Sequence, residues 1–264
     1  MDLQLYLDAA ISMARAAGQV HLRHFRSANL SMATKHCNTD VVTVADRESE
    51  ALITSMIHSQ FPDHGIIAEE GGTDHADAEW RWVVDPLDGT TNFSQGLPVF
   101  CCSIALEHRG EPEMGVVYAP RPGELFHAVR GGGAFLNGQR IRCSGKTALA
   151  DAVLATGVPY DRNTDSDNNL AEIMAVLPHV RAIRRMGSAA IDLCYTAAGF
   201  FDAYWELKLH RWDIAAGALI AREAGAQILP LRPTDSPNPA TATHSLLAAP
   251  PQLLPLLAQI LYRQ

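Results

Sequence analysis

The chain has 264 residues, 47% of them hydrophobic, and a formal net charge of −8 at pH 7. This length predicts one or two domains, and the hydrophobic fraction is ordinary for a globular protein with a real core. The acidic balance argues against a duplex nucleic-acid binder, which normally carries a basic patch. No apolar run reaches the ~18 residues of a membrane span, and the N-terminus lacks the basic region of a signal peptide.

The five cysteines are odd in number and have no CxxC spacing. They therefore indicate neither a disulfide framework nor a zinc site. Reduced thiols in a bacterial-type cytoplasm fit best, although nothing in the sequence excludes another reducing compartment.

The N-terminal part is expected to be helical. Residues 2–26 carry apolar side chains at three- and four-residue steps, which is typical of an amphipathic helix. The polar, irregular segment Asn29–Asp40 contains Lys35. A second helix then runs to about Gln60, and Thr43 with Asp46 has capping-box spacing at its start.

The middle of the chain predicts one short strand after another, separated by Gly and Pro turns. Ile66–Ala68 ends in Glu69 and Glu70, and Asn137-Gly138 is a strong type I′ hairpin signal. The other expected strands are 80–85, 99–107, 114–118, 124–129, 134–136 and 139–143. With the two helices, this antiparallel meander makes an α+β layer structure.

After Ala150 strands and helices alternate, which favours an α/β half. The expected strands are 152–156, 180–184, 201–205, 227–229 and 245–248. The expected helices are 167–177, 188–199, 213–224 and one from Pro251. The Pro/Thr/Ser-rich stretch Arg232–Thr243 is expected to be a surface loop.

The stretch Trp80–Phe93 organises the chain. Its apolar strand ends at Asp85, where Pro86 is expected to stop the pairing. Asp88-Gly89 is a turn, and a short helix follows. Carboxylates at this place can hold a hard cation, and free backbone N–H groups can hold an anion. The alternative is an ordinary turn with two solvated carboxylates, and Asp-x-x-Asp-Gly-Thr alone does not decide between them.

The fuller run Asp85–Phe93 resembles the signature of the inositol monophosphatase family, within the lithium-sensitive, Mg²⁺-dependent phosphatase superfamily. Further segments look like family elements in the same order: 69–70, 156–162, 187–193 and 212–217. Gly71 stands where the family often has Ser, and Ala226 where it commonly has Gly. The resemblance implies an α-β-α-β-α sandwich. Its halves are 1–147, with most metal ligands, and 148–264, with Asp213 and substrate contacts.

The resemblance also implies a site that binds two to three Mg²⁺ ions. The implied metal ligands are Glu69, Asp85, the Leu87 carbonyl, Asp88 and Asp213. The implied catalytic residues are Thr90, Asp46 and Glu69, with water attacking directly and no phosphoenzyme. The implied substrate contacts are Asp88, Gly89, Thr90, Gly187, Ser188, Ala189 and Glu206.

Plain structural alternatives exist for several of these residues. On local sequence Asp46 is a helix cap, Asp213 an N-cap, and Glu206 an exposed acid at a strand end. His210 is expected to be structural rather than a ligand. Lys35 is by default a surface lysine, with closure over a phosphate as the weaker alternative.

We therefore expect a Mg²⁺-dependent phosphate monoester hydrolase, with inositol 1-phosphate favoured because Thr91-Asn92-Phe93 looks like the inositol branch. Histidinol-phosphate phosphatase, or another sugar or nucleotide phosphatase, is the alternative. A role as an RNA-polymerase or ribosome-biogenesis accessory stays open, because Arg184–Leu193 resembles such members. A small-molecule monoester, a homodimer, a cytoplasmic location and no membrane partner complete the expectation.

Overall fold

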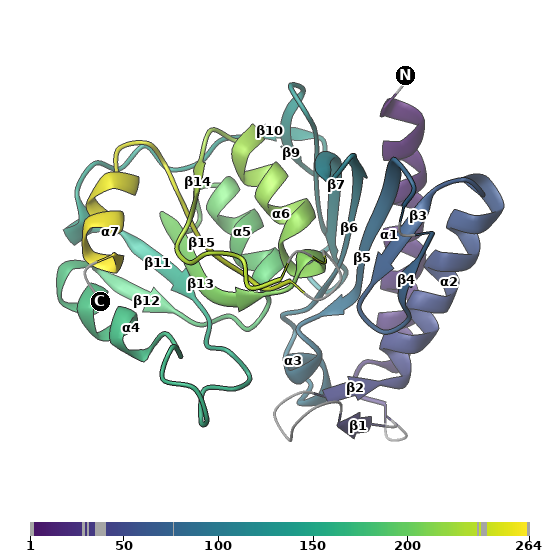
Figure 1. Ribbon diagram of the computed structural model, residues 1–264, viewed down its shortest axis with the longest axis horizontal. Coiled ribbons are helices and arrows are strands. Elements are labelled where there is room, and N and C mark those ends of the chain that lie inside the picture. The colour runs from purple at the N-terminus through teal and green to yellow at the C-terminus, as the bar shows by residue number, and fades with distance from the viewer. Residues whose placement is uncertain are drawn as a thin grey trace.

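A computed structural model describes residues 3–27, 30, 32–34, 41–75, 77–236, 238 and 242–262. Within them, helices and sheets alternate in layers (Figure 1). The outer helices α1 (Leu3–His24) and α2 (Val44–Gln60) cover one face of a large sheet. The central helices α5 (Ala189–Ala197) and α6 (Arg211–Glu223) separate it from a smaller sheet, whose far face carries α4 (Leu170–Val176) and α7 (Leu254–Leu261). The expected α-β-α-β-α sandwich is confirmed.

The start of α2 follows the expected capping box. The Thr43 side chain accepts from the Ala45 N–H, and the Asp46 carboxylate accepts the Thr43 N–H at 2.8 Å. The segment expected to be irregular contains a strand, β1 (Met32–Thr34), antiparallel to β2 (Val41–Thr43). Lys35 lies outside the described residues, as do residues 237 and 239–241 of the expected Arg232–Thr243 loop.

The large sheet has the order β10-β9-β8-β7-β6-β5-β3-β4. Its strands are β3 (Gly65–Ala68), β4 (Gly72–Asp74), β5 (Trp80–Asp88), β6 (Cys101–His108), β7 (Glu111–Ala119), β8 (Glu124–Val129), β9 (Gly133–Leu136) and β10 (Gln139–Ile141). From β5 to β10 the pairing is antiparallel, as predicted. Asn137 and Gly138 have φ of 48° and 78°, as a type I′ hairpin needs. The parallel β3–β5 pair and the edge strand β4 were not predicted.

The prediction that Pro86 ends the strand pairing is wrong. β5 continues to Asp88, and Asp85 pairs with Ser103 while Asp88 pairs with Cys101. One extra residue on β5 makes a bulge, which is where a strand accommodates a proline. The bulge separates Asp85 and Asp88 within one strand end, and the Leu87 N–H turns back to Asp85 Oδ1 at 3.0 Å.

The smaller sheet has the order β12-β11-β13-β15-β14. Its strands are β11 (Val153–Thr156), β12 (Ala182–Arg184), β13 (Ala203–Leu209), β14 (Gln227–Pro230) and β15 (His244–Ala249). β11 is parallel to β12 and β13, while β15 is antiparallel to β13 and β14. β13 runs past Trp205 to Leu209. The sequence had suggested that Glu206 stands at a strand end, but the structure places it inside β13.

The central helices pack on both sheets. Ala190 and Ala216 lie in one buried cluster with Val83 and Phe126 of the large sheet. A Cβ on Gly115 of β7 would come within 2.9 Å of the Ala216 backbone, so the glycine lets α6 lie close to the sheet. The apolar core is thus continuous across residue 147, and the division into 1–147 and 148–264 stays a prediction. Among the described residues, no helix combines the length and the apolar character that crossing a membrane requires.

His21 connects α1 to the strand end that carries the two aspartates. Its side chain is fully buried, and its Nε2 donates to the Pro86 carbonyl oxygen at 2.8 Å. The rings of Phe93 and Phe100 pack against the imidazole. Burial lowers the pKa of His21 from 6.5 to about 4, with the bond to Pro86 opposing the shift.

This pKa predicts a pH-dependent stability. Between pH 6.5 and 4 the unfolded chain binds a proton at His21 that the folded chain does not, so stability is complete above 6.5 and falls below it. At pH 5 the loss from this group is about 2 kcal/mol. Urea unfolding of wild type and His21→Gln at pH 7 and pH 5 measures it. The variant is expected to lose less stability between the two pH values, and an equal loss would contradict the assignment.

Candidate functional site

A cleft lies where the end of β5 meets the beginnings of α5 and α6. Every implied ligand and substrate contact lines it, namely Glu69, Asp85, Leu87, Asp88, Gly89, Thr90, Gly187, Ser188, Ala189, Glu206 and Asp213. Asp46 lies behind Thr90, to which it is hydrogen-bonded. Residues that are far apart in the chain, from Asp46 to Asp213, therefore meet at one place. Their individual roles stay predictions.

Asp85 is at the centre of the acidic group. It is 2% exposed, and its carboxyl group is within hydrogen-bond reach of that of Glu69. The parallel pairing of β3 with β5 explains this contact between Glu69 and Asp85. Glu69 is the residue after β3, and its N–H donates to Val84 O, next to Asp85, at 3.3 Å. Burial raises the pKa of Asp85 well above its usual value, and the charges of Glu69, Asp88 and Asp213 raise it further. The pKa of Asp213 is raised by burial and then by Asp88 and Glu69.

These acids fit a hard divalent cation by their chemistry. Buried carboxylates that remain ionised side by side are costly without a counter-charge. The implied ligands, four carboxylates and the Leu87 carbonyl, supply only oxygen, which suits Mg²⁺ better than Zn²⁺. Among the described residues, no three His, Cys, Asp or Glu side chains already form a ready-made metal cluster. A common ion would therefore require the acidic side chains to change their present positions.

Asp88 is fixed by the start of α5. Its Oδ2 accepts the Ser188 hydroxyl at 2.6 Å and the Ala190 N–H at 2.8 Å. Burial raises the pKa of Asp88, and these bonds oppose the shift. The Ser188 hydroxyl also caps α5 by accepting the Ile191 N–H at 3.3 Å. The side chain of this implied substrate contact is thus engaged in holding Asp88.

Thr90 opens the short helix α3 (Thr90–Ser94). Its hydroxyl lies 2.9 Å from both Asp46 Oδ1 and the Leu87 carbonyl oxygen, so it can donate to either. The other Asp46 oxygen accepts the N–H and hydroxyl of Thr43. Asp46 is therefore a helix cap and the partner of Thr90 at the same time. Both interpretations of this residue are compatible.

The local sequence had suggested that Asp213 is the N-cap of α6, but the structure shows that it is not. The helix begins at Arg211 with His210 at the cap, and Asp213 is its third residue. Asp213 Oδ2 accepts the His210 N–H at 2.7 Å. The His210 ring stacks on Trp212 with centroids 4.7 Å apart. The N-cap, His210, lies three residues before Asp213, because the Asp213 carboxylate reaches back to the His210 N–H at the helix start.

Several residues of the cleft were not assigned from the sequence. Gly157 is needed because a Cβ there would come within 1.9 Å of Glu206 Oε1. Glu206 accepts the Tyr204 hydroxyl at 2.6 Å. Burial raises the pKa of Glu206 to about 7, while Tyr204 and the charge of Arg185 oppose the shift. The motif at 156–162 was noticed, but its spacing did not reveal the contact with Glu206.

Lys208 is another residue of the cleft that was not assigned from the sequence. It has a left-handed backbone, with φ of 58°. Its Nζ pairs with Asp161 at 2.8 Å and Asp165 at 2.7 Å, which holds the loop after β11 beside the cleft. These partners are more than 40 residues away in sequence, and no local pattern indicates them.

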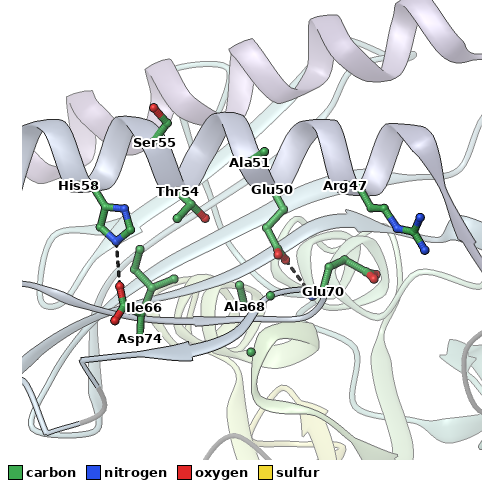
Figure 2. A pocket seen from close by; sticks show the side chains of 12 residues that line it. Arg47, Glu50, Ala51, Thr54, Ser55, His58, Ile66, Ala68, Glu70 and Asp74 are labelled. Atoms are coloured by element: carbon green, nitrogen blue, oxygen red, sulfur yellow. Dashed lines mark hydrogen bonds and ion pairs between the residues drawn. The ribbon is translucent and has the colours of Figure 1, made fainter.

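A larger groove lies between α2 and the β3–β4 hairpin (Figure 2). Its volume is about 690 Å³, against about 100 Å³ for the cleft with the acids. Figure 2 shows Glu50 reaching from α2 to the backbone of Glu70, and His58 reaching to Asp74. Size alone favours this groove, but the implied ligands line the smaller cleft, and we place the candidate active site there.

Comparisons with known proteins find relatives along the chain. The Inositol monophosphatase family matches residues 2–264. A Vibrio cholerae protein named Nus factor SuhB is 48% identical over 221 residues, or 83% of each chain. A Rhizobium meliloti protein named Inositol-1-monophosphatase is 45% identical over 227 residues, or 84% of this chain and 81% of that protein. A solved inositol monophosphatase from Anabaena superposes with a TM-score of 0.88 at 36% identity, covering 100% of this chain and 97% of that one.

The turn at Gly89 gives a prediction. Gly89 has φ of 93°, and a Cβ there would lie 2.8 Å from the Val99 carbonyl oxygen. Gly123 has φ of 70° with open space around it, so it is a matched control. We expect Gly123→Ala to cost about 1–2 kcal/mol of stability through backbone strain. Gly89→Ala is expected to cost about 3 kcal/mol or more, because steric overlap is added. Urea unfolding measures both, and equal losses would exclude the close contact.

Proposed function

Because the chain belongs to the inositol monophosphatase family, we propose that it is a Mg²⁺-dependent phosphate monoesterase that acts on inositol 1-phosphate. One observation carries the proposal: Glu69, Asp85, Asp88 and Asp213 line a single cleft beside Thr90. In this proposal the four acids and the Leu87 carbonyl hold two to three Mg²⁺ ions. Bound Mg²⁺ supplies an activated water at neutral pH and charge neutralisation for the phosphate and the leaving oxygen.

The chain's own groups position the reactants. The Thr90 hydroxyl donates to Asp46, so its oxygen is left to accept a hydrogen bond from the attacking water. This contact turns the oxygen lone pair of the water toward phosphorus. The N–H groups at the start of α3 have no acceptor within the helix, and those of Gly89 and Thr90 bind a phosphate oxygen. Water attacks directly, and no residue of the chain becomes phosphorylated.

The polyol part of the substrate faces the other wall of the cleft. Glu206 offers a carboxylate that accepts a substrate hydroxyl, and the Gly187–Ala189 backbone lies beside it. Because many sugar and polyol phosphates present similar hydroxyls, contacts of this kind discriminate modestly. Histidinol phosphate therefore remains the main alternative substrate, with sugar and nucleotide monophosphates after it.

A phosphate-release assay tests the proposal. The substrates are inositol 1-phosphate, histidinol phosphate, 3′-phosphoadenosine 5′-phosphate and fructose 1,6-bisphosphate, each with and without Mg²⁺ and lithium. We expect Mg²⁺-dependent, lithium-inhibited release that is fastest with inositol 1-phosphate. Thr90→Ala is expected to lower kcat about a hundredfold, because the attacking water loses its orientation.

Thr91→Ala is the matched control for this variant. Thr91 is the next residue of α3 and is exposed, outside the cleft lining. We expect it to keep wild-type kcat. Absence of Mg²⁺-dependent release from all four substrates contradicts the proposed function, and normal turnover by Thr90→Ala contradicts the role of Thr90.

A transcription-associated role is the second candidate. Several relatives, including the one from Vibrio cholerae, are named Nus factor SuhB. Arg184 and Arg185 are exposed just before α5, in the segment that resembles members with such a role. An Asp88→Asn variant separates the two functions, since it is expected to lose phosphate release. If it still retains RNA polymerase from a cell extract as wild type does, the second function exists beside the first, and if neither protein does, the candidate is wrong.

A further inference from the structure

Two buried carboxylates on α2 bind segments that carry implied site residues. Asp46 is 0% exposed and Glu50 is 7% exposed. They are four residues apart and so lie on the same face of the helix. Asp46 binds the Thr90 hydroxyl, whereas Glu50 Oε2 accepts the Glu70 N–H at 2.8 Å (Figure 2). One helix face thus holds two segments that carry implied site residues.

The bond from Glu50 fixes the peptide that follows Glu69. β3 ends at Ala68 and β4 begins at Gly72, so Glu69 lies in the short turn between them. On one side, the Glu69 N–H donates to Val84 O at a long 3.3 Å. On the other side, the Glu70 N–H donates to Glu50 at 2.8 Å. The backbone of Glu69 is therefore held from both directions, and the shorter bond is the one that α2 supplies.

Gly71 provides the space for this contact. A Cβ at Gly71 would lie 2.7 Å from Glu50 Oε1. A residue with a side chain there would press on the carboxylate that holds the turn. The absence of a side chain at Gly71 therefore leaves the space that the Glu50 carboxylate occupies.

We propose that Glu50 is a positioning residue for Glu69: by accepting the Glu70 N–H it sets the direction in which the Glu69 carboxylate points into the cleft. The inference rests on the proposed function, in which Glu69 is a Mg²⁺ ligand. Partners that orient metal ligands through one further hydrogen bond commonly change metal affinity about 10–100-fold when they are removed. Glu50 acts here through the backbone of the turn, without touching the ion or the substrate.

Three substitutions at Glu50 separate the hydrogen bond from the charge. Glu50→Leu removes the acceptor. Glu50→Asp keeps the charge, but its shorter side chain cannot reach the Glu70 N–H. Glu50→Gln keeps the length and an acceptor oxygen while removing the charge. The control is Glu48→Leu on the same helix, since Glu48 is more exposed and pairs with Arg23 and His24 of α1 instead.

Mg²⁺ affinity of the full-length proteins is measured by calorimetry, and phosphate release from inositol 1-phosphate is followed against Mg²⁺ concentration. Thermal unfolding in EDTA reports the stability without metal. We expect Glu50→Leu and Glu50→Asp to bind Mg²⁺ about tenfold more weakly, with activity recovering at saturating Mg²⁺. Glu50→Gln and Glu48→Leu should bind as wild type does. If Glu50→Leu does not fold, the comparison of Glu50→Asp with Glu50→Gln decides alone.

The outcomes distinguish this inference from the function on which it rests. Wild-type Mg²⁺ affinity in both Glu50→Asp and Glu50→Leu overturns the positioning role, even when their thermal stability in EDTA is reduced. Weak binding by Glu50→Gln with normal binding by Glu50→Asp also overturns it, because charge rather than the hydrogen bond would then matter. A wild-type protein that neither binds Mg²⁺ nor releases phosphate overturns the proposed function itself.

Discussion

The structure depends on gathering carboxylates that repel one another. Glu69 follows β3, Asp85 and Asp88 lie on β5, and Asp213 lies on α6. All four line one small cleft, where burial and mutual charge raise the pKa values of Asp85 and Asp213. The surrounding backbone offsets part of this cost through donors: the start of α5 for Asp88 and the His210 N–H for Asp213. Such an arrangement stores electrostatic energy that a bound cation would release.

Much of this layout could be predicted from local sequence, because local physics decides it. The capping box at Thr43 and Asp46, the hairpin at Asn137-Gly138 and the antiparallel meander all follow from short-range patterns. For the candidate site, local signals placed only Asp85 and Asp88 together, at the end of a strand. The family resemblance then supplied what spacing alone did not, namely that Glu69, Asp85, Asp88 and Asp213 belong to one metal site.

The features that were missed depend on distant partners. The bulge that carries Asp85 and Asp88 exists because β6 pairs with both sides of Pro86, and the sequence of β5 alone cannot show that. The long β13, which places Glu206 inside a strand, depends in the same way on β15. The hydrogen bond between Glu50 and the Glu70 backbone joins residues that are 20 positions apart in the sequence. Neither the sequence of α2 nor that of the β3–β4 turn indicates it. Non-local pairing thus decides the fine geometry.

Asn92 has a consequence for how the molecule can move. Its side-chain amide donates to Val99 O at 2.9 Å and to Met186 O at 2.8 Å, and so ties α3 to the segment just before α5. Together with the apolar core that the large sheet shares with the central helices, these two bonds oppose a hinge-like separation of the two sheets. Access to the cleft is therefore expected to depend on movement of the surrounding loops more than on separation of its walls.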